Sequence, residues 1–114
     1  MLATIKLVDL QNDLERGSIL RCKGLYPYEN YVDFLVAEHF ENNKRQYALV
    51  VISGYKAGST YVVLPEESVP MENQGYAIDL EWLKLNWHKW GYFDCPLDEV
   101  YSVYRAIPAN YDDY

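Results

Sequence analysis

Two short apolar runs separated by a glycine-containing turn are the most distinctive pattern in the chain. The runs 48–52 and 61–64 are rich in β-branched residues, which favours strands buried on both faces over a helix. Two glycines between the runs permit the positive φ angles that a chain reversal requires. The pattern therefore predicts an antiparallel hairpin of strands 46–53 and 60–65, with a loop longer than the two-residue minimum.

Helical periodicity follows further along the chain. The apolar positions on one predicted helical face are Leu80, Leu83, Trp87 and Trp90. Asp79 precedes this face, where a carboxylate can accept a free backbone N–H and face the positive end of the helix dipole. Gly91 is a typical residue to end a helix. The pattern predicts one main helix over 79–90, with Trp87 and Trp90 in the core.

Four more segments read as strands, interrupted by turn residues and prolines. They are 4–10, 18–22, 31–40 and 100–107, with a turn over 11–17, a break at 26–28 and a charged turn over 41–45. The terminal segment 109–114 is polar and acidic, so we expect it to fray.

The segment 31–40 fits two periodicities. Val32, Phe34, Val36 and Phe40 share one face of a strand, with Glu38 as the exception. Helical spacing also relates Val32, Leu35, Val36 and His39, so a helix over this span stays open as the alternative. Taken together, the elements predict an α+β fold in which a mostly antiparallel sheet carries the helix of residues 79–90 on one face.

Length and composition place the chain among globular proteins. At 114 residues, half of them hydrophobic, it is expected to form a single domain over 1–114. No run approaches the roughly 20 apolar residues of a membrane helix, and no signal peptide is recognisable. We therefore expect a cytoplasmic protein without membrane contact, and its oligomeric state stays open with a monomer favoured.

The candidate chemistry is sparse. Cys22 and Cys95 are too few and too far apart for a disulfide framework, and we expect buried thiols. These cysteines and the two histidines lack zinc-ligand spacing, so we expect no metal and no cofactor. His39 and His88 are the candidate bases of a small enzyme, but neither has a serine or cysteine at motif spacing. No catalytic residue is predicted.

The distribution of charge is more informative than its total. The net charge of −7 arises entirely after residue 56, because the first 56 residues carry equal numbers of acids and bases. All the charged residues between positions 57 and 83 are carboxylates: Glu66, Glu67, Glu72, Asp79 and Glu81. Such a field repels nucleic acid and attracts basic proteins, although a solvated surface is the alternative interpretation.

Aromatic residues make up 16% of the chain and twelve of them are tyrosines. Base stacking on nucleic acid requires a basic groove as well, which the charge argues against. Aromatic side chains beside carboxylates are also typical of protein-binding surfaces. Trp82 lies off the apolar helical face, so we expect it to be exposed.

Several short motifs in order resemble a known family. They are Arg16-Gly17-Ser18, the turn 53–58, the Leu-Pro-Glu-Glu-Ser segment 64–68, and Trp82-Leu83 with Asn86-Trp87 and Trp90. In these residues the chain is similar to the immunity proteins of bacterial polymorphic toxin and contact-dependent growth inhibition systems. The resemblance implies a non-catalytic, mostly β protein that binds and inactivates a cognate toxin in the cytoplasm.

Resemblance and charge together predict a toxin partner that is a nuclease, because a nuclease holds phosphates in a basic groove. The expected toxin-binding residues are Glu66, Glu67, Glu72, Asp79, Glu81, Tyr55, Tyr76 and Trp82. If the acidic residues are only a solvated surface, the predicted interface lies around Tyr31, Tyr47 and Tyr101. A small enzyme and an oligomeric scaffold are the alternative functions.

Overall fold

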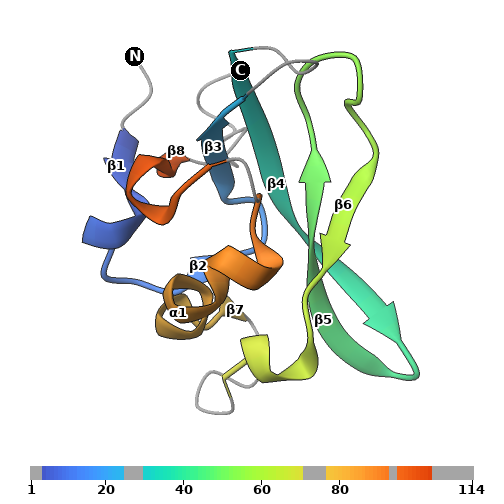
Figure 1. Cartoon of the computed structure of the whole chain (residues 1–114). Helices are drawn as coiled ribbons and strands as arrows, with labels where there is room; N and C mark the ends of the chain where they lie inside the picture. Colours follow the sequence, from blue (N-terminus) through green and yellow to red (C-terminus); the bar gives the residue numbers. More distant parts are fainter. Residues whose placement is uncertain (1–3, 25–29, 71–76, 93–94, 104–114) are drawn as a thin grey trace, which may run out of the picture.

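A six-stranded antiparallel sheet with the helix α1 on one side forms the framework of the described part of the protein (Figure 1). The computed structural model describes residues 4–24, 30–70, 77–92 and 95–103. The strand order is β1-β8-β3-β4-β5-β6, so β8 inserts between two strands from the beginning of the chain. This arrangement confirms the predicted α+β class.

The large sheet contains β1 (Thr4–Lys6), β3 (Ile19–Lys23), β4 (Tyr31–Glu41), β5 (Lys44–Val51), β6 (Thr60–Val63) and β8 (Tyr101–Val103). A second sheet pairs β2 (Leu14–Glu15) with β7 (Ala77–Ile78). The helix α1 spans Leu80–Trp90, and the 3-10 turns of the described residues are η1 (Leu7–Asp9), η2 (Glu66–Ser68) and η4 (Leu97–Glu99). No helix in the described part of the chain is long and apolar enough to cross a membrane.

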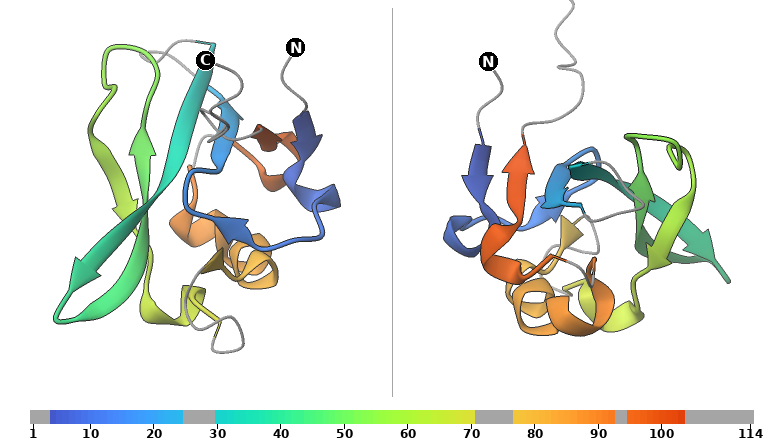
Figure 2. Two further views of the ribbon diagram at one scale, coloured as in Figure 1. Left: turned by 180° about the vertical axis from the view of Figure 1, so that it is seen from behind. Right: turned by 45° about the horizontal axis from the view of Figure 1, so that its top comes forward.

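The β4–β5 hairpin settles the ambiguous segment 31–40 as a strand. Its register runs from Phe34 opposite Val51 to Glu41 opposite Lys44. Asn42 and Asn43 form the turn with φ values of 53° and 61°, a conformation that asparagine tolerates better than most residues. The outer part of the hairpin extends past the other elements (Figure 2). Phe40 shares a strand face with the buried Val32, Phe34 and Val36, as predicted, but it lies in that outer part and is 60% exposed.

The predicted central hairpin is also confirmed, although β5 begins and ends two residues before the predicted strand 46–53, and β6 ends two residues before the predicted end at residue 65. β5 pairs with β6, and the register shifts between Leu49 and Val50. The connecting loop uses Gly54 and Gly58 at positive φ, as the sequence indicated.

Helix α1 buries Leu80, Leu83 and Trp87 against the sheet and begins after the predicted cap. The Asp79 carboxylate accepts hydrogen bonds from the backbone N–H groups of Glu81 and Trp82. Gly91 closes the helix at a φ of −84°, so its role does not depend on a left-handed conformation. A Cβ at this position would lie 2.2 Å from the Trp87 ring, and glycine is required for that close approach.

Two predictions about the start of the chain were wrong. The segment 4–10 is not one strand, because β1 ends at Lys6 and the buried Leu7 begins η1 with its N–H bonded to the Val100 carbonyl. The segment 11–17 is more than a turn, because β2 lies within it and Leu14 pairs with Ile78. Both features depend on partners that are distant in the sequence.

The other strand predictions agree with the structure where it describes them, but the predicted charged turn 41–45 is reduced to Asn42 and Asn43, because β4 extends to Glu41 and β5 begins at Lys44. β3 matches the expected strand at 18–22, and β8 confirms the first part of the strand at 100–107. The predicted break at 26–28, the residues 104–107 and the tail 109–114 lie outside the described residues.

Candidate functional site

The start of α1 and the turn η2 lie against each other and bring acidic residues together. The Asp79 N–H donates to the Ser68 carbonyl at 2.7 Å, which joins η2 to the first residue before the helix. Ser68 is fully buried, and its hydroxyl donates to the Pro65 carbonyl at 2.6 Å. Glu66 and Glu67 are therefore held at the surface beside the N-terminal end of α1.

The fold partly neutralises the predicted acidic residues. Lys44 reaches from the β4–β5 hairpin to Glu66 with Nζ 2.7 Å from the carboxylate, and Lys84 lies 3.7 Å from Glu81. The segment 57–83 contains no basic residue, but the fold therefore places the basic side chains of Lys44 and Lys84 close to it. Glu67 has no ion-pair partner among the described residues. The Glu66 and Glu81 side chains are 62% and 79% exposed, so both carboxylates stay accessible to a partner.

Asp13 is an additional carboxylate here that the sequence analysis did not identify. It accepts a hydrogen bond of 3.0 Å from the backbone N–H of Leu80, the donor next to the two that Asp79 accepts. Two carboxylates thus satisfy the first N–H groups of α1 and add negative charge at the positive end of its dipole. Only the β2–β7 pairing brings Asp13 to this position, so helix capping rules applied to residues 79–82 do not find it.

Aromatic side chains on α1 lie next to these carboxylates. The rings of Trp82 and Trp90 have centroids 6.4 Å apart, and both side chains are half-buried. Trp90 was expected in the core and Trp82 at the surface, so each prediction is only partly right. Lys89 Nζ lies 6.0 Å from the Trp90 ring centroid. The two indoles pack against the edge of the core and keep part of their surface accessible.

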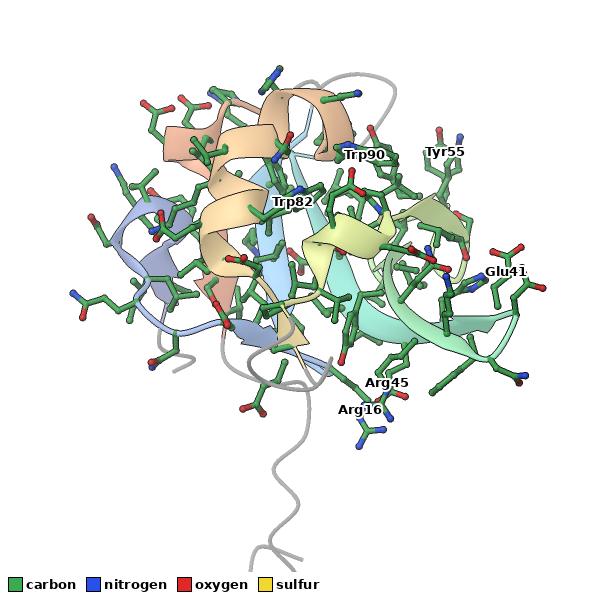
Figure 3. The ribbon with its side chains drawn as sticks, turned by 90° about the horizontal axis from the view of Figure 1, so that it is seen from below. Arg16, Glu41, Arg45, Tyr55, Trp82 and Trp90 are labelled. Atoms are coloured by element: carbon green, nitrogen blue, oxygen red, sulfur yellow. The ribbon has the colours of Figure 1, made fainter. Side chains whose placement is uncertain are left out.

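Figure 3 shows Trp82 and Trp90 on the side of α1 that faces η2. The β5–β6 loop, which contains the exposed Tyr55, lies at the opposite end of these strands from η2 (Figure 1), so this predicted residue is not brought beside the two tryptophans. We call the surface formed by Glu66, Glu67, Glu81, Trp82 and Trp90 the α1–η2 face. Leu85, on the outward side of the same helix, is 74% exposed and was also missed. Its position opposite Leu83 and Trp87 on a helical wheel is the signal that would have identified it.

The alternative tyrosine surface does not form. Tyr47 is fully buried, because its position on β5 points into the core beside Glu38. Tyr31 is exposed, and its ring centroid lies 5.6 Å from Cζ of the Arg21 guanidinium, which is positioned over the ring. Arg21 makes a two-bond ion pair with Asp33, at 2.8 and 2.9 Å, which raises the pKa of the guanidinium further. Tyr101 is half-buried.

His39 lies on β4 and His88 on α1, so the two histidines belong to different elements. His39 Nε2 is 3.7 Å from a carboxylate oxygen of Glu41 on β4. His88 lines a depression of about 420 Å³ together with Lys84, Trp87, Tyr92 and Cys95. In the described ranges no three His, Cys, Asp or Glu side chains are grouped closely enough to hold a metal ion.

Two predicted binding residues, Glu72 and Tyr76, lie outside the described residues. The structure therefore brings together Glu66, Glu67, Asp79, Glu81 and Trp82 from the predicted set. The Asp79 carboxylate caps the helix, so it is already engaged in hydrogen bonds with the backbone N–H groups of Glu81 and Trp82.

The chain matches the family model described as immunity protein 45 over residues 7–102. No curated protein and no solved structure matches the chain. The matched range covers β3 to β6, α1 and almost all of the remaining described elements.

Proposed function

The chain belongs to the immunity protein 45 family, and on this premise we propose that it neutralises a toxin nuclease by occluding the active site with the α1–η2 face. The family match is the observation that carries the neutralising function and implies a cognate toxin as the partner. The class of toxin and the binding face are proposals that rest on charge and surface chemistry.

The charge supports a basic partner. A nuclease must hold phosphates in a positively charged groove, and an acidic inhibitor complements that groove. The chain carries a net charge of −7, and Glu66, Glu67 and Glu81 are exposed on the α1–η2 face. Charges of this kind steer the two proteins together and increase the association rate.

The aromatic residues support a protein interface with defined anchors. Trp82 and Trp90 present accessible indole surface on α1, and tryptophan is enriched among residues that dominate binding energy. Leu85, on the outward side of the same helix, adds exposed apolar surface. The protein acts by binding in the cytoplasm, and no residue of this face has a catalytic role.

The function is tested with the toxin encoded beside the gene. Cells that express this toxin are expected to grow only when the chain is co-expressed, and the purified pair should form a complex. Addition of the purified chain should stop cleavage of nucleic acid by the toxin. A complex that protects cells from a toxin without nuclease activity would overturn the nuclease assignment but not the neutralising function.

The binding face is tested with two aromatic residues in different places, the half-buried Trp82 and the exposed Phe40. Trp82→Ala should weaken toxin binding by about tenfold or more, as expected for an anchor residue. Phe40→Ala on the β4–β5 hairpin is the matched control and should leave the dissociation constant nearly unchanged. Equal effects of the two variants would show that the α1–η2 face is not the binding face.

A further inference from the structure

The middle of the large sheet is apolar on both of its faces, although α1 covers only one of them. The runs 48–52 and 61–64 contain no charged residue, and this pattern predicted strands buried on both faces. An antiparallel sheet with one face in water normally alternates apolar and polar positions along each strand. The packing of α1 therefore explains one of the two apolar faces and leaves the other unexplained.

Cross-strand pairing gathers the outward side chains of three strands into one apolar band. Leu35 on β4 lies opposite Val50 on β5. Two residues further from Leu35 along β4, Ala37 lies opposite Ala48 on β5, which lies opposite Val63 on β6. Side chains two residues apart on a strand share a face, so all of them point to the same side of the sheet. We call the surface formed by Leu35, Ala37, Ala48, Val50, Ile52 and Val63 the back face.

The back face lies outside the hydrophobic core. The alternate side chains on the same strands, such as Phe34 and Leu49, belong to the core cluster together with the buried residues of α1, whereas no back-face residue belongs to it. Figures 1 and 2 show α1 and η2 on one side of β4, β5 and β6, and no described helix or strand covers the other side. The larger back-face side chains on the strands are half-buried, and Ile52 is 37% exposed. Contiguous apolar surface of this kind marks an interaction site.

Charged residues of both signs flank the back face at its two ends. At one end Arg21 makes its two-bond ion pair with Asp33, whose carbonyl accepts from the Ile52 N–H at 2.9 Å. At the other end Glu41 lies opposite Lys44 across the hairpin. These four charges cancel, so they do not repel an identical surface. The carboxylates of the α1–η2 face lie on the elements that cover the opposite side of the sheet.

We propose that the back face binds the back face of a second copy of the chain and forms a two-fold symmetric dimer. A two-fold interface brings identical patches together, so the patch has to complement itself. An uncharged band with balanced charges at its ends meets this condition, and two sheets can pack face to face about 10 Å apart. A basic protein is attracted instead to the acidic side of the molecule.

The dimer keeps both copies competent to bind a toxin. Because the sheet separates the back face from α1, the two α1–η2 faces point away from the contact. Each copy can then hold one toxin, which gives a complex of two chains and two toxins. This stoichiometry rests on the proposed function, but the dimer itself does not. The mass of the chain alone therefore tests the dimer, and a failure of the toxin assignment leaves that result unchanged.

Sedimentation of the full chain without toxin is the first experiment. Across the micromolar range the protein should have twice the mass of the 13.4 kDa chain. Added salt should not dissociate the dimer, because salt screens charges and leaves apolar contacts intact. A wild-type monomer at every concentration, or a dimer that dissociates as salt is added, would overturn the proposal.

Three lysine substitutions locate the contact. Val50→Lys buries an unpaired charge in the centre of the interface and should give a monomer. Ile52→Lys lies beyond the end of β5 and should weaken the dimer about tenfold or more, which keeps the test decisive if Val50→Lys does not fold. Leu85→Lys is the matched control, because Leu85 is 74% exposed on the outward side of α1, and it should stay dimeric. Circular dichroism verifies the fold of each variant. A folded Ile52→Lys that dimerises like the wild type, or a monomeric Leu85→Lys, would show that the back face is not the contact.

Discussion

Trp87 connects three parts of the molecule through one side chain. It is 3% exposed, packs its ring against Gly91 and donates from Nε1 to the Cys95 carbonyl. The helical spacing of Leu80, Leu83 and Trp87 predicted its burial. The contact with Gly91 was not predictable, because glycine after a helix usually indicates a left-handed cap rather than a close approach.

Removing this ring should leave a cavity under α1. We expect Trp87→Ala to lower the free energy of unfolding by about 3–5 kcal/mol. Trp87→Phe keeps much of the volume and should cost less. Urea unfolding measures both, and wild-type stability of Trp87→Ala would contradict the packing described here.

Tyr47 should make stability sensitive to alkaline pH. Burial is the main cause that raises its pKa above 10 in the folded state. Its contribution to stability is present below pH 10 and is lost as the pH rises towards the folded pKa, because the phenol ionises first in the unfolded chain. The stability difference between wild type and Tyr47→Phe should therefore change above pH 10. Parallel curves in urea titrations from neutral to alkaline pH would contradict this.

Elements whose hydrophobic periodicity lies within one segment of the sequence could be predicted. Elements that form only by pairing with a residue far away in the sequence could not. The long strand β4, the hairpin with β6 and α1 carry their periodicity within one segment of sequence. The strand β2 has two residues and exists because Leu14 pairs with Ile78. The end of β1 is set by Leu7, whose N–H bonds to Val100. No local pattern encodes either partner.

The start of α1 depends on carboxylates from two elements, Asp79 and Asp13. Replacing Asp79 with alanine leaves the Glu81 and Trp82 N–H groups without their acceptor and should cost about 1 kcal/mol. Asp79→Asn retains an acceptor oxygen and should cost less. Thermal unfolding distinguishes the three proteins, and identical midpoints would show that the cap does not stabilise the helix.

At the scale of the whole molecule, the fold changes the charge pattern that the sequence indicates. The excess of carboxylates after residue 56 does reach one surface, since η2 and α1 are joined by the bond between Asp79 and Ser68. Glu67, Glu81 and Trp82 could be predicted for this face from sequence. Lys44 could not, because the twist and length of the β4–β5 hairpin determine that it meets Glu66.

The central claim is that the α1–η2 face meets a basic toxin. A matched pair of double variants tests it: Glu67→Lys with Glu81→Lys on this face, and Asp9→Lys with Glu41→Lys elsewhere on the exposed surface. Both change the net charge equally. Exposed substitutions of this kind usually change stability by only about 0.5 kcal/mol, so both variants should fold.

The most direct measurement is the association rate with the toxin as a function of ionic strength. Wild type and the Asp9/Glu41 variant should associate fast at low salt and slow down steeply as salt is added. The Glu67/Glu81 variant should associate more slowly at low salt and depend less on ionic strength. Identical salt dependence of the two variants would contradict the assignment of this face.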